Sequence, residues 1–129
     1  ETLQGAVIDP LTGGLLNPGE AGYLQAAVAQ WAGQPVLSTG TAARFSTTVS
    51  VEGGGFWVPF LMTNGTLEQL LDGDTGNDPL VFTPFLGANP DRLDHVKLLA
   101  DNTFGFEDLV VNSDFDFDDL VVRITVVPV

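Results

Sequence analysis

The amino-acid sequence predicts a mostly-β fold, an antiparallel β-sandwich of jelly-roll-like type with one short N-terminal helix. Short apolar or alternating runs are separated by clusters of Asp, Asn, Gly and Pro, and the 15 glycines and 8 prolines mark turns. Helical spacing of apolar residues is found in residues 20–32. With 129 residues, 44% of them hydrophobic, the chain suits a single domain spanning residues 1–129 with a buried core.

The N-terminal third contains the predicted helix. Residues 4–9 favour a short edge strand, and residues 10–14 favour the turn after it. Residues 20–32 are rich in Ala, Leu and Gln, which are strong helix formers. The residues that share one face of this helix are spaced four apart: Tyr23, Ala27 and Trp31.

The rest of the chain is predicted to form strands and turns. Branched and aromatic residues favour strands over five segments: residues 43–51, 56–62, 80–85, 95–99 and 120–127. Pro59 indicates an edge strand or a bulge. Asn64 and Gly65 favour a hairpin turn. The last segment is apolar at nearly every position, which predicts a strand in the middle of a sheet with both faces covered.

Charge and composition exclude several function classes. The 17 acidic and 4 basic residues give a formal charge of −13, so binding to nucleic acid or an anionic membrane would work against repulsion. The absence of cysteine excludes disulfides and thiolate metal sites, and one histidine leaves little scope for a zinc enzyme. No apolar run is long enough to span a membrane. The chain begins at Glu1, from which we expect a processed product or a segment of a longer protein.

Residues 101–119 are the most acidic segment of the chain. Two like charges about 4 Å apart repel by about 4 kcal/mol at the effective dielectric of a protein surface. Converging carboxylates therefore need a cation or shifted pKa values, and the chain has too few Lys and Arg to pair them all. The seven carboxylates of this segment are those of Asp101, Glu107, Asp108, Asp114, Asp116, Asp118 and Asp119.

Calcium is the cation that this segment favours. Ca²⁺ takes six to eight oxygen ligands in a flexible geometry, and residues 114–118 offer an aspartate at every second position. Phe115 and Phe117, which alternate with the aspartates, are expected to pack inward as anchors. The spacing fails as an EF-hand, because the sixth loop position is Asp119 and the twelfth is Thr125. The alternative is a solvated acidic loop that keeps the domain soluble.

Several motifs of the C-terminal half resemble those of a known family. Residues 104–108 read FGFED, and residues 114–119 read DFDFDD and are followed by LVV. Upstream, residues 88–91, 94–98 and 59–66 extend the similarity. In these motifs the chain resembles the family catalogued as domain of unknown function 4114, which is found in large secreted bacterial proteins.

The resemblance implies a calcium-dependent, β-rich module of a bacterial adhesin-like or surface-layer-like protein, with no established enzymatic activity. The positions that match the acidic motif, and so the expected metal ligands, are Glu107, Asp108, Asp114, Asp116, Asp118 and Asp119. Asp94 and Asp101 are additional candidate ligands. The family commonly has Asn in place of Asp118 and a Gly-rich loop in place of residues 110–113.

Other motifs favour ordinary structural roles. Residues 74–76 read DTG, the tripeptide of aspartic proteases, but their polar flanks favour a turn or a second cation loop. His95 is expected to be a hydrogen-bonded strand residue. Three aromatic residues, which in another arrangement would form a sugar-binding platform, are expected in the core instead: Tyr23, Trp31 and Trp57. No serine lies in a G-x-S-x-G context.

We therefore expect a noncatalytic, calcium-stabilised β-sandwich that forms part of a larger secreted or cell-surface protein, with the ion holding the acidic segment to the last strand. Two alternatives remain open. One is a calcium-dependent carbohydrate-binding module, in which the ion bridges sugar hydroxyls. The other is an enzyme that acts on polysaccharide through a pair of carboxylates, for which any two of the many acidic residues would serve.

Overall fold

The structure is a computed structural model that describes residues 5–30, 46–48 and 58–127. Its strands and helices are all short. In chain order they are β1 (Val7–Ile8), β2 (Leu15–Leu16), α1 (Tyr23–Ala29), β3 (Leu61–Thr63), α2 (Leu67–Leu71), β4 (Leu80–Phe82), the 3-10 helix η1 (Leu86–Ala88), β5 (Val96–Ala100), β6 (Thr103–Phe106) and β7 (Leu120–Arg123).

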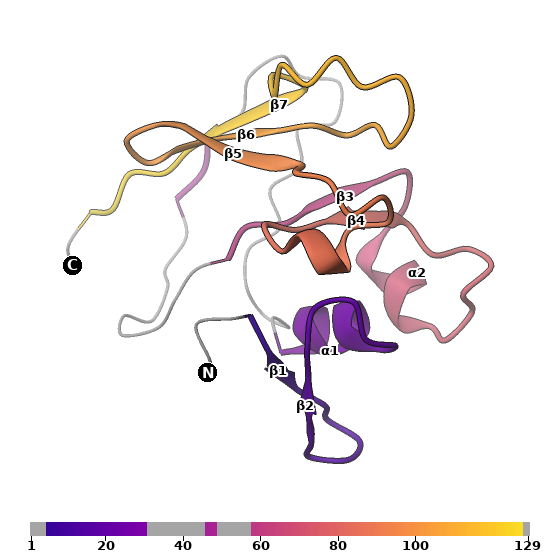
Figure 1. The fold of residues 1–129 in the computed structure, drawn as a ribbon. Helices are drawn as coiled ribbons and strands as arrows, with labels where there is room; N and C mark the ends of the chain where they lie inside the picture. Colours follow the sequence, from indigo (N-terminus) through magenta and orange to yellow (C-terminus); the bar gives the residue numbers. More distant parts are fainter. Residues whose placement is uncertain (1–4, 31–45, 49–57, 128–129) are drawn as a thin grey trace.

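The described strands form antiparallel sheets in the orders β1-β2, β3-β4 and β5-β6-β7. In Figure 1 the β5-β6-β7 sheet lies at one end of the molecule, the β1-β2 hairpin and α1 lie at the other, and β3 and β4 lie between them. The mostly-β class with antiparallel sheets is confirmed. The stacking of these sheets as a sandwich stays a prediction.

The β5-β6-β7 sheet differs from the sequence analysis at two strands. β6 begins at Thr103, within the segment predicted to be an acidic loop, because Phe104 and Phe106 alternate with smaller residues as in a half-buried strand. β7 lies at the end of the strand order and, among the described strands, pairs with β6 alone. Val121 is 49% exposed, so the prediction that both faces of this strand are covered is wrong. Apolar residues alone do not indicate on which side a strand has a neighbour.

The N-terminal elements agree with the sequence analysis in type and differ in length. Residues 10–14 form the turn of the β1-β2 hairpin, as predicted, and the helix is shorter than residues 20–32. The Tyr23 hydroxyl donates to the Gly5 carbonyl at 2.8 Å and so joins α1 to the chain ahead of β1. The buried helical positions are Tyr23, Ala26 and Val28, whereas Trp31 lies outside the described residues.

α2 is a second α-helix that the sequence analysis did not predict. Thr66 and Gln69 form a capping box, in which the Thr66 hydroxyl accepts from the Gln69 N–H and the Gln69 side chain accepts from the Thr66 N–H. The prediction of a hairpin at Asn64 and Gly65 is therefore wrong, since these residues lead into the helix. Residues 64–79 separate β3 from β4. The T-x-x-Q spacing was the available signal.

Predicted strands 43–51 and 56–62 fall largely outside the described residues. Residues 46–48 are described and are not in a strand, and β3 begins at Leu61, after Pro59. Predicted strands 80–85 and 95–99 correspond to the shorter β4 and to β5.

β4 links α1 and α2 to the β5-β6-β7 sheet. Val81 packs in a core cluster with Val28 of α1 and Leu70 of α2. The next side chain, Phe82, points to the other face, where its ring stacks on that of His95 with centroids 4.0 Å apart. Both Val81 and Phe82 are buried, so each face of β4 is covered.

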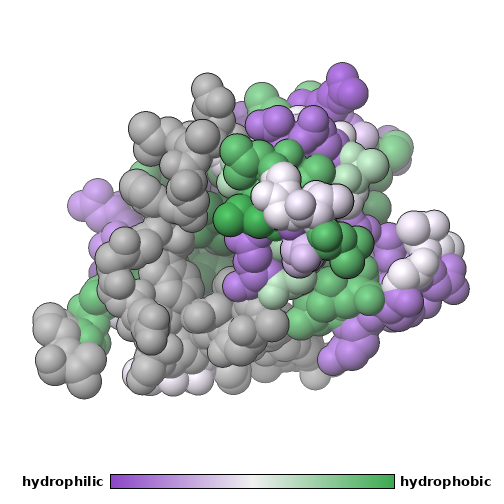
Figure 2. Space-filling view, turned by 90° about the horizontal axis from the view of Figure 1, so that it is seen from below, coloured by the Kyte–Doolittle hydropathy of each residue, from purple (hydrophilic) through white to green (hydrophobic). Residues whose placement is uncertain are grey.

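One face of the molecule shows a surface of mixed polarity. The face seen from below in Figure 2, on the side of the β1-β2 hairpin, shows apolar residues among hydrophilic ones. Exposed apolar side chains of that hairpin are those of Ile8, Leu11 and Leu15. None of the helices in the described part of the chain is long and apolar enough to cross a membrane.

Gly105 of β6 is required by the close approach of the acidic segment. A Cβ atom there would lie 2.3 Å from the Phe117 carbonyl oxygen and 2.7 Å from the Leu99 side chain.

Gly105→Ala is therefore expected to lower the free energy of unfolding by about 1–3 kcal/mol through overpacking, measured by urea denaturation. Gly14→Ala is the control, since its nearest contact would be 3.4 Å away, and its cost should stay below about 0.5 kcal/mol. Equal losses in the free energy of unfolding for Gly105→Ala and Gly14→Ala would contradict the requirement for glycine at position 105.

Candidate metal centre

The pairing of β6 with β7 brings together Glu107 and Asp119 of the acidic segment. Phe106 lies opposite Leu120 in the register, so Glu107 leaves one strand where Asp119 enters the other. The Asp108 N–H donates to a carboxylate oxygen of Asp119 at 3.0 Å. Residues 107–119 are thus a closed loop at one end of the sheet.

Glu107 is the buried residue of this loop. It is 1% exposed, and neither carboxylate oxygen has a hydrogen-bond partner. Its backbone is fixed, because its N–H donates to the His95 carbonyl at 3.0 Å and its own carbonyl accepts from the His95 ring at 2.8 Å. Burial raises the pKa of Glu107, and the charges of Asp119 and Asp114 add to this effect, whereas the Ser113 hydroxyl opposes it.

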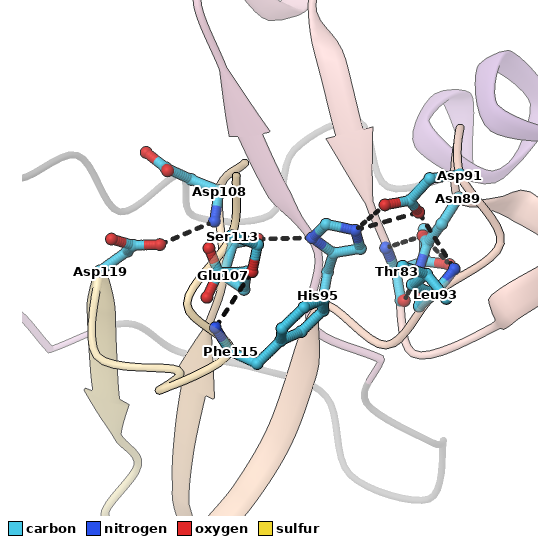
Figure 3. A network of polar contacts seen from close by, with 10 residues as sticks. All are labelled: Thr83, Asn89, Asp91, Leu93, His95, Glu107, Asp108, Ser113, Phe115 and Asp119. Atoms are coloured by element: carbon cyan, nitrogen blue, oxygen red, sulfur yellow. Dashed lines mark hydrogen bonds and ion pairs between the residues drawn. The ribbon is translucent and has the colours of Figure 1, made fainter. Parts of the chain in front are cut away.

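The carboxylates around Glu107 form two groups, each with ligand oxygens within 4.8 Å of one another. The first group contains Glu107, Asp108 and Asp119, and the second contains Glu107, Asp114 and Asp116. Figure 3 shows the Glu107 carboxylate on the side of Asp119 and directed away from the imidazole of His95. These acidic groups could hold a metal ion through oxygen atoms alone.

The backbone of the second group is curled by residues of positive φ. Phe115 and Phe117, at φ 56° and 60°, lie in the left-handed region, which costs about 1–3 kcal/mol for a non-glycine residue. Phe117 is buried and has the Lys97 ammonium 5.1 Å from its ring centroid, as expected of an anchor. Phe115 is 51% exposed, so the prediction that both rings pack inward is wrong for Phe115.

Unpaired negative charge surrounds these groups. Burial raises the pKa of Asp108, and Asp119 adds to this effect. The shared hydrogen bond and charge of Asp116 raise the pKa of Asp118, which belongs to neither group. Within the described residues, no Lys or Arg lies within ion-pair distance of the loop carboxylates.

His95 connects the loop to the core. It is fully buried, and its Nε2 lies 3.0 and 3.1 Å from the two carboxylate oxygens of Asp91 (Figure 3). Nδ1 faces the Glu107 carbonyl, so both ring nitrogens of His95 have hydrogen-bond partners. Burial opposes ionisation of Asp91, but the Leu93 N–H and His95 outweigh it and lower the pKa of that carboxyl.

Asn89 supports the Asp91 side of this network. Its buried side chain accepts from the Thr83 N–H at 2.7 Å and donates to the carbonyls of Thr83 and Leu93. These hydrogen bonds join the two ends of the segment between β4 and β5. Asp91 is therefore held opposite His95 by the chain on both sides of it.

Five of the six carboxylates expected as metal ligands are thus brought together, and Asp118 is their neighbour. Asp101 lies in the turn between β5 and β6, at the opposite end of the sheet from Glu107. Asp94 is exposed and belongs to neither group. Sequence reasoning missed the role of Asp91 and His95 in holding Glu107, and the D-x-x-D-H spacing gave no signal of it.

Residues 74–76 form the polar turn that their flanks predicted. Asp74 accepts from the Gly76 N–H at 3.0 Å, and Asp72 accepts from the Asp74 N–H and from the Asn77 side chain. These residues are exposed. The hydrogen bonds account for the motif as a local turn.

Comparison with known proteins identifies the family. Residues 52–127 match the model of the family described as Domain of unknown function (DUF4114). This match covers more than half of the chain, so the chain belongs to that family, as the resemblance indicated. No curated protein and no solved structure matches the chain.

Glu107 is expected to give the metal-free protein a distinctive pH dependence. An acid whose pKa is raised by folding stabilises the folded state below its unfolded pKa, near 4.5, and this contribution is lost as pH rises through the folded pKa. In excess EDTA, Glu107→Gln should therefore gain stability relative to wild type as pH rises from about 4 to about 7. Thermal unfolding over this range measures the difference.

The matched control is Glu68→Gln. A hydrogen bond from its own backbone N–H and one from the Thr66 hydroxyl lower the pKa of the exposed Glu68, so wild type should gain stability relative to this variant as pH rises. A constant difference between wild type and Glu107→Gln at every pH would contradict the burial of an unpaired carboxylate.

His95 is expected to be a stabilising residue of the core. In His95→Phe the ring volume and its stacking on Phe82 are retained, but the Asp91 carboxylate and the Glu107 carbonyl lose their donor. The expected cost is about 2–4 kcal/mol in urea denaturation. Asp94→Asn, at the exposed neighbouring position, is the control and should change stability by less than about 0.5 kcal/mol. A His95→Phe variant as stable as wild type would exclude this role.

Proposed function

We propose that this family member is a noncatalytic calcium-binding module of a larger extracellular or cell-surface protein of adhesin-like type. The observation behind the proposal is Glu107, a fully buried carboxylate with no hydrogen-bond partner at the centre of two acidic groups. A buried charge without a partner is costly, and a cation removes that cost.

The donor chemistry favours calcium among the metals. The ligands on offer are carboxylate oxygens, the chain has no cysteine, and both nitrogens of its one histidine are hydrogen-bonded. The site therefore offers few suitable ligands to metals that prefer thiolate or imidazole ligands. Magnesium demands near-ideal octahedral geometry and gives up water reluctantly, whereas calcium accepts an irregular set of oxygens from a curled loop.

The role that we propose for calcium is structural. The first group contains residues next to both β6 and β7, and the second joins Glu107, next to β6, to the middle of the loop, so calcium bound there would hold the loop to the strand ends. An extracellular site with a dissociation constant of about 10⁻⁴ to 10⁻³ M is occupied in a millimolar medium and empty in a submicromolar cytosol. Folding of the loop would then be completed after export.

We also infer that the antiparallel sheets stack as a β-sandwich. Support comes from β4, whose Phe82 stacks on His95 at the start of β5. This contact between β4 and the residue that precedes β5 supports the proposed stacking. The absence of cysteine suits a secreted bacterial module in which bound ions, instead of disulfides, secure a loop.

A second candidate function is calcium-dependent carbohydrate binding, which Phe115 favours. Its ring is half exposed between two aspartates of one acidic group, where it could stack on a sugar whose hydroxyls complete the coordination of the ion. Binding on a glycan array that needs calcium and is lost in Phe115→Ala, with calcium binding retained, would support this function. No binding across the array would exclude it.

Calcium is expected to raise the midpoint of thermal unfolding. Ten-fold to hundred-fold excess over the dissociation constant stabilises the native state by about 1.4–2.7 kcal/mol, or about 5 °C or more for a domain of this size. Wild type should show this shift on going from EDTA to calcium, and magnesium should not reproduce it.

Two variants test where the calcium acts. The double variant Asp116→Ala, Asp119→Ala removes one carboxylate from each acidic group and should lose the shift. The control Asp72→Asn, Asp74→Asn lowers the charge of another exposed loop by the same amount and should keep it. Identical midpoints for wild type in EDTA and calcium, with no metal in the sample by elemental analysis, would overturn the proposal.

A further inference from the structure

The two acidic groups share only Glu107. Asp108 and Asp119 flank the ends of β6 and β7, whereas Asp114 and Asp116 lie on the curled part of the loop. Among the described residues, no group combines the first pair with the second within the same 4.8 Å limit. A single ion at the position of one group therefore leaves the other pair of carboxylates without a partner.

Glu107 has the capacity to serve both groups. Each of its two oxygens is buried and has no hydrogen-bond partner, so neither is committed to the protein. Its backbone is fixed by two hydrogen bonds to His95, which hold the side chain at the junction of the groups. A carboxylate placed in this way can give one oxygen to each of two cations.

The local charge also favours two ions. The two groups contain five carboxylates, and Asp118 beside them makes six. One divalent ion would leave a large excess of negative charge in a loop that has no Lys or Arg partner among the described residues. Two divalent ions neutralise most of that charge.

We infer that the site is binuclear, with Glu107 bridging two calcium ions. One ion is held with Asp108 and Asp119, and the other with Asp114 and Asp116. Backbone carbonyls and water complete each coordination shell. This inference rests on the proposed calcium function and specifies the number of ions and the residue that couples them.

The first test is the stoichiometry of calcium binding to the whole chain by isothermal titration. Wild type is expected to bind about two ions per chain. Asp119→Asn should retain about one, through the second group, and Asp114→Asn should retain about one, through the first. Asp72→Asn is the control and should still bind about two. Far-UV circular dichroism checks that each variant is folded.

The second test measures the distance between the ions. Wild type loaded with a mixture of terbium and europium should show energy transfer from terbium to europium, because a shared carboxylate holds the two ions close together. Transfer should be lost in Asp119→Asn and in Asp114→Asn, which keep one ion each. In Glu107→Gln the affinities of both ions should fall.

The outcomes separate this inference from the proposed function. One ion per chain in wild type, with binding abolished by either Asn variant, would overturn the binuclear site and leave a single calcium site standing. Two ions without energy transfer would overturn the bridging role of Glu107. No calcium binding in wild type would overturn the proposed function itself.

Discussion

The buried carboxylate of Glu107 is the constraint on which the site depends. The register of β6 and β7 places Glu107 beside Asp119, two hydrogen bonds to His95 fix its backbone, and its side chain is buried. Without a hydrogen-bond partner, this side chain must be neutral or must face a cation. The surrounding aspartates favour the cation, because each additional negative charge makes an unpaired carboxylate costlier.

The site is coupled to the core through one side chain. His95 stacks on Phe82, binds Asp91 and holds the backbone of Glu107, so the packing of β4 and the position of the acidic loop are linked. Asn89 extends the link to the end of β4. An ion at the loop would therefore stabilise more than the loop itself, because loosening Glu107 disturbs contacts that reach the β3-β4 sheet.

Tight packing also explains two sequence features that function alone would not require. A glycine lies between the two phenylalanines of β6 because the Phe117 carbonyl occupies the space that a side chain at position 105 would need. Phe117 is buried on that strand and anchors the curled segment, whereas Phe115 remains at the surface. Only one of the two phenylalanines that alternate with the aspartates is therefore an anchor, since the left-handed backbone at both does not direct their side chains to the same side.

The sequence by itself determined the mostly-β class, the first helix and the acidic segment, because strand propensity, helical spacing and charge density are local properties. It did not locate β6 within that segment or show that, among the described strands, β7 pairs with β6 alone, because pairing partners are distant in sequence. Only the tertiary structure decided which carboxylates converge. Asp101 is near Glu107 in the chain but lies at the other end of the sheet, whereas Asp119 reaches Glu107 because antiparallel pairing returns the chain to it.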